Sequence, residues 1–198
     1  MTDAPPARAW QRMLSGRRLD LLDPSPLDIE VEDIAHGLSR VARWNGQTRG
    51  ANPFSVAEHS LLVERLAGMG RAPLTGPWRM AALLHDAPEY VMGDLISPFK
   101  ATIGGAYHAL EARLLAAVHR RFGLPAELPK GVTAAIKRAD RMAAWFEATQ
   151  LAGFSEAEAA RHFPRPRALP GITLSPLPPE RAKHAFVERF EALASERG

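Results

Sequence analysis

Apolar residues recur along most of this chain at intervals of three and four, the spacing of one face of an α-helix. Ile34, Leu38 and Val41 show this pattern, and Gly or Pro residues interrupt it at intervals. Ser55 followed by Glu58 is typical of a capping box, which predicts where one helix begins. The pattern predicts helices over Glu32–Arg43, Val56–Gly68, Trp78–Pro88, Tyr107–Phe122, Val132–Leu151 and Glu180–Glu196.

The N-terminal region is expected to be partly extended. A short helical stretch is predicted over Ala9–Leu14, and a small ribbon is predicted between Arg18–Leu22 and Asp28–Val31. Pro24 and Pro26 exclude a helix between the two segments of the ribbon. The chain is therefore expected to carry a short extended N-terminal appendage.

The remaining segments point to one domain. Residues 89–100 are expected to be irregular, and the six prolines within 164–179 indicate a segment that wraps over the surface. This segment is not interpreted as a linker, because the roughly twenty residues after it cannot form a core alone. We expect an all-α fold as a single domain over 1–198, with a core in about 30–150 and the wrap and last helix in 164–198.

Composition limits the chemistry. The 198 residues include seven histidines and no cysteine, which excludes disulfides, thiolate metal sites and a thiol nucleophile. Twenty-five Lys and Arg against 22 Asp and Glu give a net charge of only +3, so nucleic-acid binding is not favoured. No apolar run approaches the length of a membrane span, and the N-terminus does not resemble a signal peptide. A cytoplasmic protein without membrane contact is expected.

Several histidines and acids stand where a helix should be apolar. His59 and Asp140 fall on the apolar faces of their helices, and His85-Asp86 follows five apolar residues. Singly, such residues are most simply core histidines with hydrogen bonds, or acids that cap a helix or pair with arginine. Together, two imidazoles and two carboxylates suit one divalent metal, with Co, Mn or Zn favoured over Mg. Glu89 is available beside them for proton transfer.

The order of these residues resembles the HD-domain metal-dependent phosphohydrolases, which are named for their His–Asp pair. Arg43-Trp44 matches a pair in the bacterial 5′-deoxynucleotidase branch of that family. The segments Ser15–Arg18 and Asp33–Ala35 are similar to a related bacterial and prophage subgroup. Further pieces that match, which together cover about residues 30–150, are Ser55–Ser60, Leu84–Glu89, Gly93–Lys100 and Lys137–Asp140.

The resemblance implies an HD-type helical bundle that removes phosphate from deoxynucleoside 5′-monophosphates with one bound metal ion. It assigns metal binding to His59, His85, Asp86 and Asp140, and it makes Glu89 the essential acid near the phosphate. Arg43 would orient the phosphate, for which its planar guanidinium is suited, and Trp44 would press on the deoxyribose. Asp94 and Ser97 would meet the sugar and phosphate. A homodimer is also implied, with the apolar side of Glu180–Glu196 either in its interface or on the core of its own chain.

Two other functions stay open at this point. A nucleoside di- or triphosphohydrolase would use the same metal site. A protein that binds nucleotide or nucleic acid without turnover would keep the fold, although the presence of every ligand residue and of Glu89 argues against an inactive site. A purely structural module would leave four polar residues on apolar helical faces unexplained.

Overall fold

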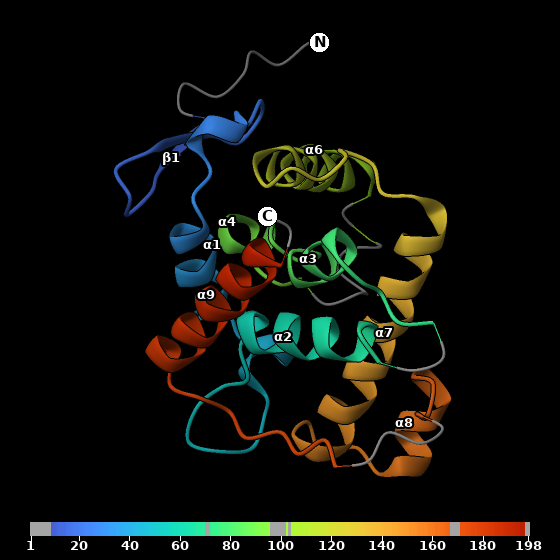
Figure 1. The fold of residues 1–198 in the computed structure, drawn as a ribbon. Coiled ribbons are helices and arrows are strands. Elements are labelled where there is room, and N and C mark those ends of the chain that lie inside the picture. Colours follow the sequence, from blue (N-terminus) through green and yellow to red (C-terminus); the bar gives the residue numbers. More distant parts are fainter. Residues whose placement is uncertain (1–8, 70–71, 96–101, 103, 167–170, 197–198) are drawn as a thin grey trace.

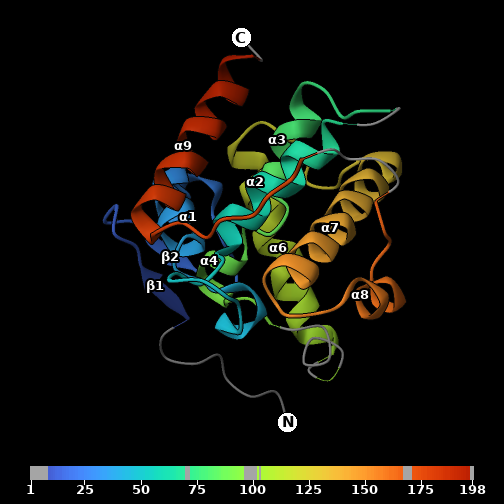
Figure 2. The same cartoon turned by 90° about the horizontal axis from the view of Figure 1, so that it is seen from below.

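Helix α2, Val56–Ala67, runs through the middle of the fold. Helix α7, Lys130–Gln150, lies on one side of it and helix α9, Pro179–Ser195, on the other (Figures 1 and 2). Ser55 and Glu58 form the predicted capping box, in which each side chain bonds the backbone N–H of the other residue, so α2 begins where the sequence places its start. Its apolar side joins the core through Val56, Val63 and Leu66.

The computed structural model describes residues 9–69, 72–95, 102, 104–166 and 171–196. Helices dominate, and the all-α fold class with a short extended N-terminal appendage is confirmed. No helix within these ranges combines the length and the hydropathy needed to cross a membrane. The other elements are β1 Trp10–Arg12, β2 Arg18–Asp20, the 3₁₀ turns Pro26–Asp28 and Arg43–Gly46, α1 Val31–Leu38, α3 Pro77–Leu83, α4 Glu89–Met92, α6 Gly105–Arg121 and α8 Glu156–His162.

The appendage is a hairpin of β1 and β2, paired antiparallel with Trp10 opposite Asp20. The predicted helix over Ala9–Leu14 is therefore wrong, and so is the predicted pairing of Arg18–Leu22 with Asp28–Val31. Gly16, at φ 88°, allows the tight turn that brings the two strands together. Arg18 packs over the Trp10 ring at 4.5 Å and Leu19 is fully buried, so contacts outside the local pattern decide the conformation.

Two predicted helices end earlier than expected. Helix α1 stops at Leu38 rather than Arg43, because Ala42 pairs with Ser55 as an isolated β-bridge. The apolar run expected to form one helix over Trp78–Pro88 instead gives α3, a turn over 84–88 and the separate short helix α4. Both breaks lie next to predicted site residues.

Helix α8 lies within a segment for which the sequence predicted no element. Ser155 and Glu158 form a second capping box, the same signal that correctly located α2. After it, residues 171–178 run without helix or strand, as expected for a wrapping segment. Gln150 of α7 holds this segment through hydrogen bonds with the backbone of Ile172 and Leu174.

The last helix covers the core of its own chain. Ala182, Phe186 and Leu193 of α9 are buried, and α9 packs on α1, α2 and α3. Of the two uses foreseen for its apolar side, the structure shows packing within the chain. A homodimer stays a prediction and is not supported by this face.

Candidate functional site

His59 lies one turn into α2 and is completely buried. Its Nδ1–H donates to Oε1 of Glu147 on α7 at 2.6 Å. The opposite ring nitrogen, Nε2, faces carboxylate oxygens of Asp86 at 3.4 Å and Asp140 at 3.3 Å. The imidazole is thus held from one side and presents its other nitrogen to two acids.

His85 and Asp86 occupy the turn that follows α3. Nδ1 of His85 lies 2.9 Å from the carbonyl oxygen of Ala82, and since a carbonyl can only accept, Nδ1 carries the proton. Nε2 of His85 lies 3.2 Å from Oδ2 of Asp86. Because α3 ends at Leu83, the turn rather than a helical face aims this pair.

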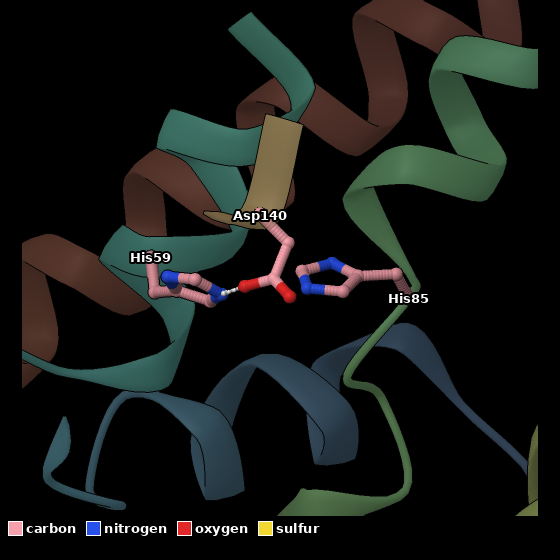
Figure 3. Close-up of side chains that lie close together, drawn as sticks. All are labelled: His59, His85 and Asp140. Atoms are coloured by element: carbon pink, nitrogen blue, oxygen red, sulfur yellow. Dashed lines mark ion pairs between the residues drawn. The ribbon is translucent and has the colours of Figure 1, made fainter. Parts of the chain in front are cut away.

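Asp140 projects from the middle of α7 toward both histidines. Figure 3 shows its carboxylate between the imidazoles of His59 and His85, with the ion pair to His59 drawn. One ligand atom from each of these three residues lies within 4.8 Å of the others, a spacing that can hold a metal ion. Asp86 borders the same space, because one of its oxygens approaches Nε2 of both histidines.

These residues fit a metal by their donor chemistry. Among the described residues, Nε2 of His59 and Nε2 of His85 are buried and make no hydrogen bond, although carboxylate oxygens lie 3.3 Å and 3.2 Å from them. Each ring donates Nδ1–H away from the cluster, to Glu147 and to the Ala82 carbonyl. Metal-binding histidines are held by outer hydrogen bonds of this kind. His59, His85 and Asp140 can therefore offer two nitrogens and one carboxylate to a divalent ion, with the Asp86 carboxylate beside them.

The charges of the cluster favour a cation at its centre. Burial raises the pKa of Asp140, but His59 and His85 hold it below its ordinary value. Burial and Arg43 oppose a charge on His59, but Glu147, Asp140 and Asp86 raise its pKa well above the ordinary value. The carboxylates thus stay ionised and attract positive charge to the point where the Nε2 atoms meet. A divalent cation there would replace the imidazolium proton.

Arg43 and Trp44 follow the early end of α1 and lie against α7. The backbone N–H of Arg43 donates to the Phe54 carbonyl, which fixes this turn beside the start of α2. The guanidinium of Arg43 donates to Asp94 at 3.1 Å and to Glu147 at 3.3 Å, and its side chain is only 15% exposed. Burial opposes its charge, but Glu147, Asp94, Asp86 and Glu89 together raise its pKa. The guanidinium of Arg43 therefore keeps its positive charge and interacts electrostatically with Asp86, one of the candidate metal ligands.

Trp44 has an unusual backbone conformation. Its φ is 56° and that of Asn45 is 51°, in the left-handed region that residues other than glycine avoid at a cost of about 1–2 kcal/mol each. The indole Nε1–H donates to Oε2 of Glu147 at 2.9 Å, and Phe154 and Phe163 lie 5.7 and 5.9 Å from its ring. The surrounding contacts therefore hold this residue in a strained position.

Of the remaining predicted residues, Glu89 begins the short helix α4 and is 2% exposed. Asp94 directly follows Gly93, whose φ of 76° ends α4, and it bonds Arg43 as described. Ser97 lies outside the described residues, so its predicted contact with the sugar and phosphate stays a prediction.

Glu147 is the important site residue that the sequence analysis missed. Its side chain is fully buried and contacts His59, Arg43 and Trp44. Burial raises the pKa of Glu147, but His59 and Arg43 lower it to about 2, so the group is a stable anion. A signal was available, because Glu147 lies seven residues after Asp140 on the same apolar face of α7.

Comparison with known proteins finds a relative of this chain but gives no function for it. No protein-family model matches the sequence. A protein from Rhodobacter capsulatus, described as uncharacterized, is 60% identical over 188 residues, which are 94% of this chain and 96% of that protein.

Proposed function

We propose that this chain, which belongs to one family with the uncharacterized Rhodobacter capsulatus protein, is a metal-dependent phosphohydrolase of the HD-domain type. The observation that carries the proposal is the arrangement of His59 and His85. Each donates its Nδ1–H to an outer acceptor and turns Nε2 toward Asp140 and Asp86. A purely structural pair of buried histidines would have no need of this common orientation.

His59, His85, Asp86 and Asp140 would hold the ion. When bound, a divalent metal lowers the pKa of a water ligand and neutralises charge on phosphoryl oxygens. The four residues come from α2, from the turn after α3 and from α7, so the packing of these elements sets the site. The ion would then lie where separate elements meet rather than on a single loop.

Arg43 and Glu89 would serve the phosphate. Among the described residues, Arg43 donates to Glu147 through Nε and to Asp94 through Nη1, which leaves Nη2 of its planar group for phosphate oxygens. Glu89 is buried and close enough to Arg43 to raise its pKa. A carboxyl group in this place can hold the attacking water or pass a proton to the leaving 5′-oxygen. Phosphoryl transfer depends mainly on such positioning and charge stabilisation.

Trp44 supports a deoxyribose substrate within this reaction class. Its ring is fixed on one edge by Glu147 and flanked by Phe154 and Phe163, so it forms a stiff wall beside Arg43. A wall that touches C2′ of the sugar would leave no space for a 2′-hydroxyl. We therefore propose deoxynucleoside 5′-monophosphates as the preferred substrates.

A phosphate-release panel tests the proposed function. Ribo- and deoxynucleoside mono-, di- and triphosphates are each incubated with purified protein and with Mn²⁺, Co²⁺, Zn²⁺ or Mg²⁺ separately. The expected result is release from deoxynucleoside monophosphates with Mn²⁺, Co²⁺ or Zn²⁺ and none in the presence of a chelator. Faster release from di- or triphosphates would replace the proposed substrate, and no release from any nucleotide would overturn the proposal.

A further inference from the structure

Glu147 connects three residues that sequence reasoning assigned to separate tasks. Oε1 accepts the Nδ1–H of His59 at 2.6 Å, whereas Oε2 accepts the indole N–H of Trp44 at 2.9 Å and the Nε–H of Arg43 at 3.3 Å. The first partner is a candidate metal ligand, and the other two are candidate substrate contacts. One carboxylate thus lies between the metal centre and the substrate wall.

Both carboxylate oxygens of Glu147 act as hydrogen-bond acceptors, and neither acts as a donor. The three partner groups, Nδ1–H, Nε1–H and Nε–H, have no acceptor role in this arrangement, so an ionised carboxylate satisfies all of them together. An amide of the same shape cannot do so, because one of its two ends carries an NH₂ group. The site therefore requires a carboxylate for a geometric reason, independent of any titration.

We propose that Glu147 is a positioning residue that aligns His59 for the metal and Arg43 with Trp44 for the nucleotide, so that metal binding and sugar discrimination depend on the same carboxylate. This inference rests on the proposed function and adds a residue to it. Its Oε1 fixes the His59 ring with Nε2 toward Asp140 and Asp86. Its Oε2 holds the indole of Trp44 in place although the backbone at Trp44 and Asn45 is strained.

The alternative role for Glu147 is purely structural, in which a buried acid holds helices together by binding arginine. Glu64 of this chain has such a role and can serve as a control. Glu64 on α2 is equally buried and is bound by Arg79 of α3 and Arg189 of α9. Within the described part of the chain, both of these arginines lie outside the candidate site. Glu64→Gln is therefore the control for Glu147→Gln, because both variants remove a buried negative charge that is bound to arginine.

The experiment compares these variants in three measurements: the dissociation constant for Mn²⁺ by calorimetry, the ratio of kcat/KM for dAMP to that for AMP, and the melting temperature. In Glu147→Gln the amide oxygen can accept either from His59 or from Trp44 and Arg43, because the NH₂ group at the other position cannot accept. We expect either Mn²⁺ binding that is about 10–100-fold weaker, a deoxy-to-ribo ratio that is about tenfold lower, or both. In Glu64→Gln the melting temperature falls while the other two quantities stay at wild-type values.

Trp44→Phe distinguishes the contributions of the two Glu147 oxygens. It removes the indole N–H that binds Oε2, keeps an aromatic ring and leaves the bond between Oε1 and His59 in place. It should lower the deoxy-to-ribo ratio and leave Mn²⁺ affinity unchanged, and it decides the question if Glu147→Gln does not fold. Wild-type values for both quantities in Glu147→Gln would overturn the proposal. Equal changes in Glu64→Gln, or an unchanged ratio in Trp44→Phe, would do the same.

Failure of the proposed function is distinguishable from failure of this inference. If the wild-type protein releases no phosphate from any nucleotide, the proposed function fails, yet Mn²⁺ affinity can still be compared between Glu147→Gln and Glu64→Gln. Wild-type affinity in Glu147→Gln would then overturn the alignment of His59. If the wild-type protein is active and the variant keeps both properties, only the inference fails.

Discussion

Nε2 of His59 lies 3.3 Å from Oδ1 of Asp140 and so joins the central helix α2 to α7 at the candidate metal centre. Replacement of Asp140 by alanine removes one of the carboxylates that this centre offers. We expect the protein to lose bound metal and activity together, with a loss of affinity beyond the 10–100-fold that an outer partner of a ligand costs. Metal content per chain after dialysis against limiting Mn²⁺ measures this.

A matched histidine pair controls the metal assignment. His119 of α6 is likewise buried with Nδ1 near the Ala126 carbonyl, but among the described residues it does not belong to the metal-binding group of His59, His85 and Asp140. His119→Gln should retain metal, whereas His59→Gln should lose it. Equal metal content in His59→Gln, Asp140→Ala and the wild-type protein would refute the assignment of these ligands.

Glu89 should separate turnover from metal binding. It begins α4 and does not belong to the candidate metal-binding group of His59, His85 and Asp140, so Glu89→Gln should keep the metal. A positioned acid or base contributes about 10²–10⁴-fold to rate, and kcat should fall by that order. The measurement is kcat with dAMP at saturating Mn²⁺, with metal content measured on the same sample. Loss of metal in this variant would contradict the separate role.

Trp44 should determine the choice of sugar. Trp44→Ala removes the aromatic wall beside Arg43, and the ratio of kcat/KM for dAMP to that for AMP should fall toward one. The change should arise from faster or tighter use of AMP, because a steric obstacle to the 2′-hydroxyl is removed. An unchanged ratio would exclude Trp44 from the sugar site.

Gly37 sets how closely α1 approaches α4, which carries Glu89. A Cβ at Gly37 would lie 2.7 Å from both Cβ and the carbonyl oxygen of Tyr90. Gly37→Ala should therefore lower the free energy of unfolding by about 1–3 kcal/mol through overpacking. Gly131 of α7 has open space at the same point, so Gly131→Ala should be neutral or stabilising by up to about 1 kcal/mol. Urea denaturation of both variants checks the contrast, and equal stabilities would contradict it.

Local signals located much of the fold. The capping box of Ser55 and Glu58 marked the start of α2, and the 3.6-residue period located α6, α7 and α9 to within a few residues. The placing of His59 and Asp140 on apolar faces led to their grouping, because an unpaired polar side chain is costly to bury. These are properties of short segments, which the sequence displays directly.

Long-range contacts account for what the sequence did not show. The bridge between Ala42 and Ser55 ends α1 early, and the pairing of Trp10–Arg12 with Arg18–Asp20 overrides a helical pattern. Neither partner is evident from local periodicity. Glu147 was missed for a different reason: its importance comes from three partners on other elements, although its position on the apolar face of α7 was a usable signal.

The most direct test of the central claim is the recovery of activity as metal is returned to a chelated protein. Mn²⁺ is added stepwise to metal-free wild-type protein and to metal-free Asp140→Ala, and phosphate release from dAMP is measured after each addition. The account predicts that wild-type activity rises until one ion is bound per chain and then stays constant, while Asp140→Ala stays inactive. Full activity of the metal-free wild-type protein, or equal recovery in Asp140→Ala, would contradict it.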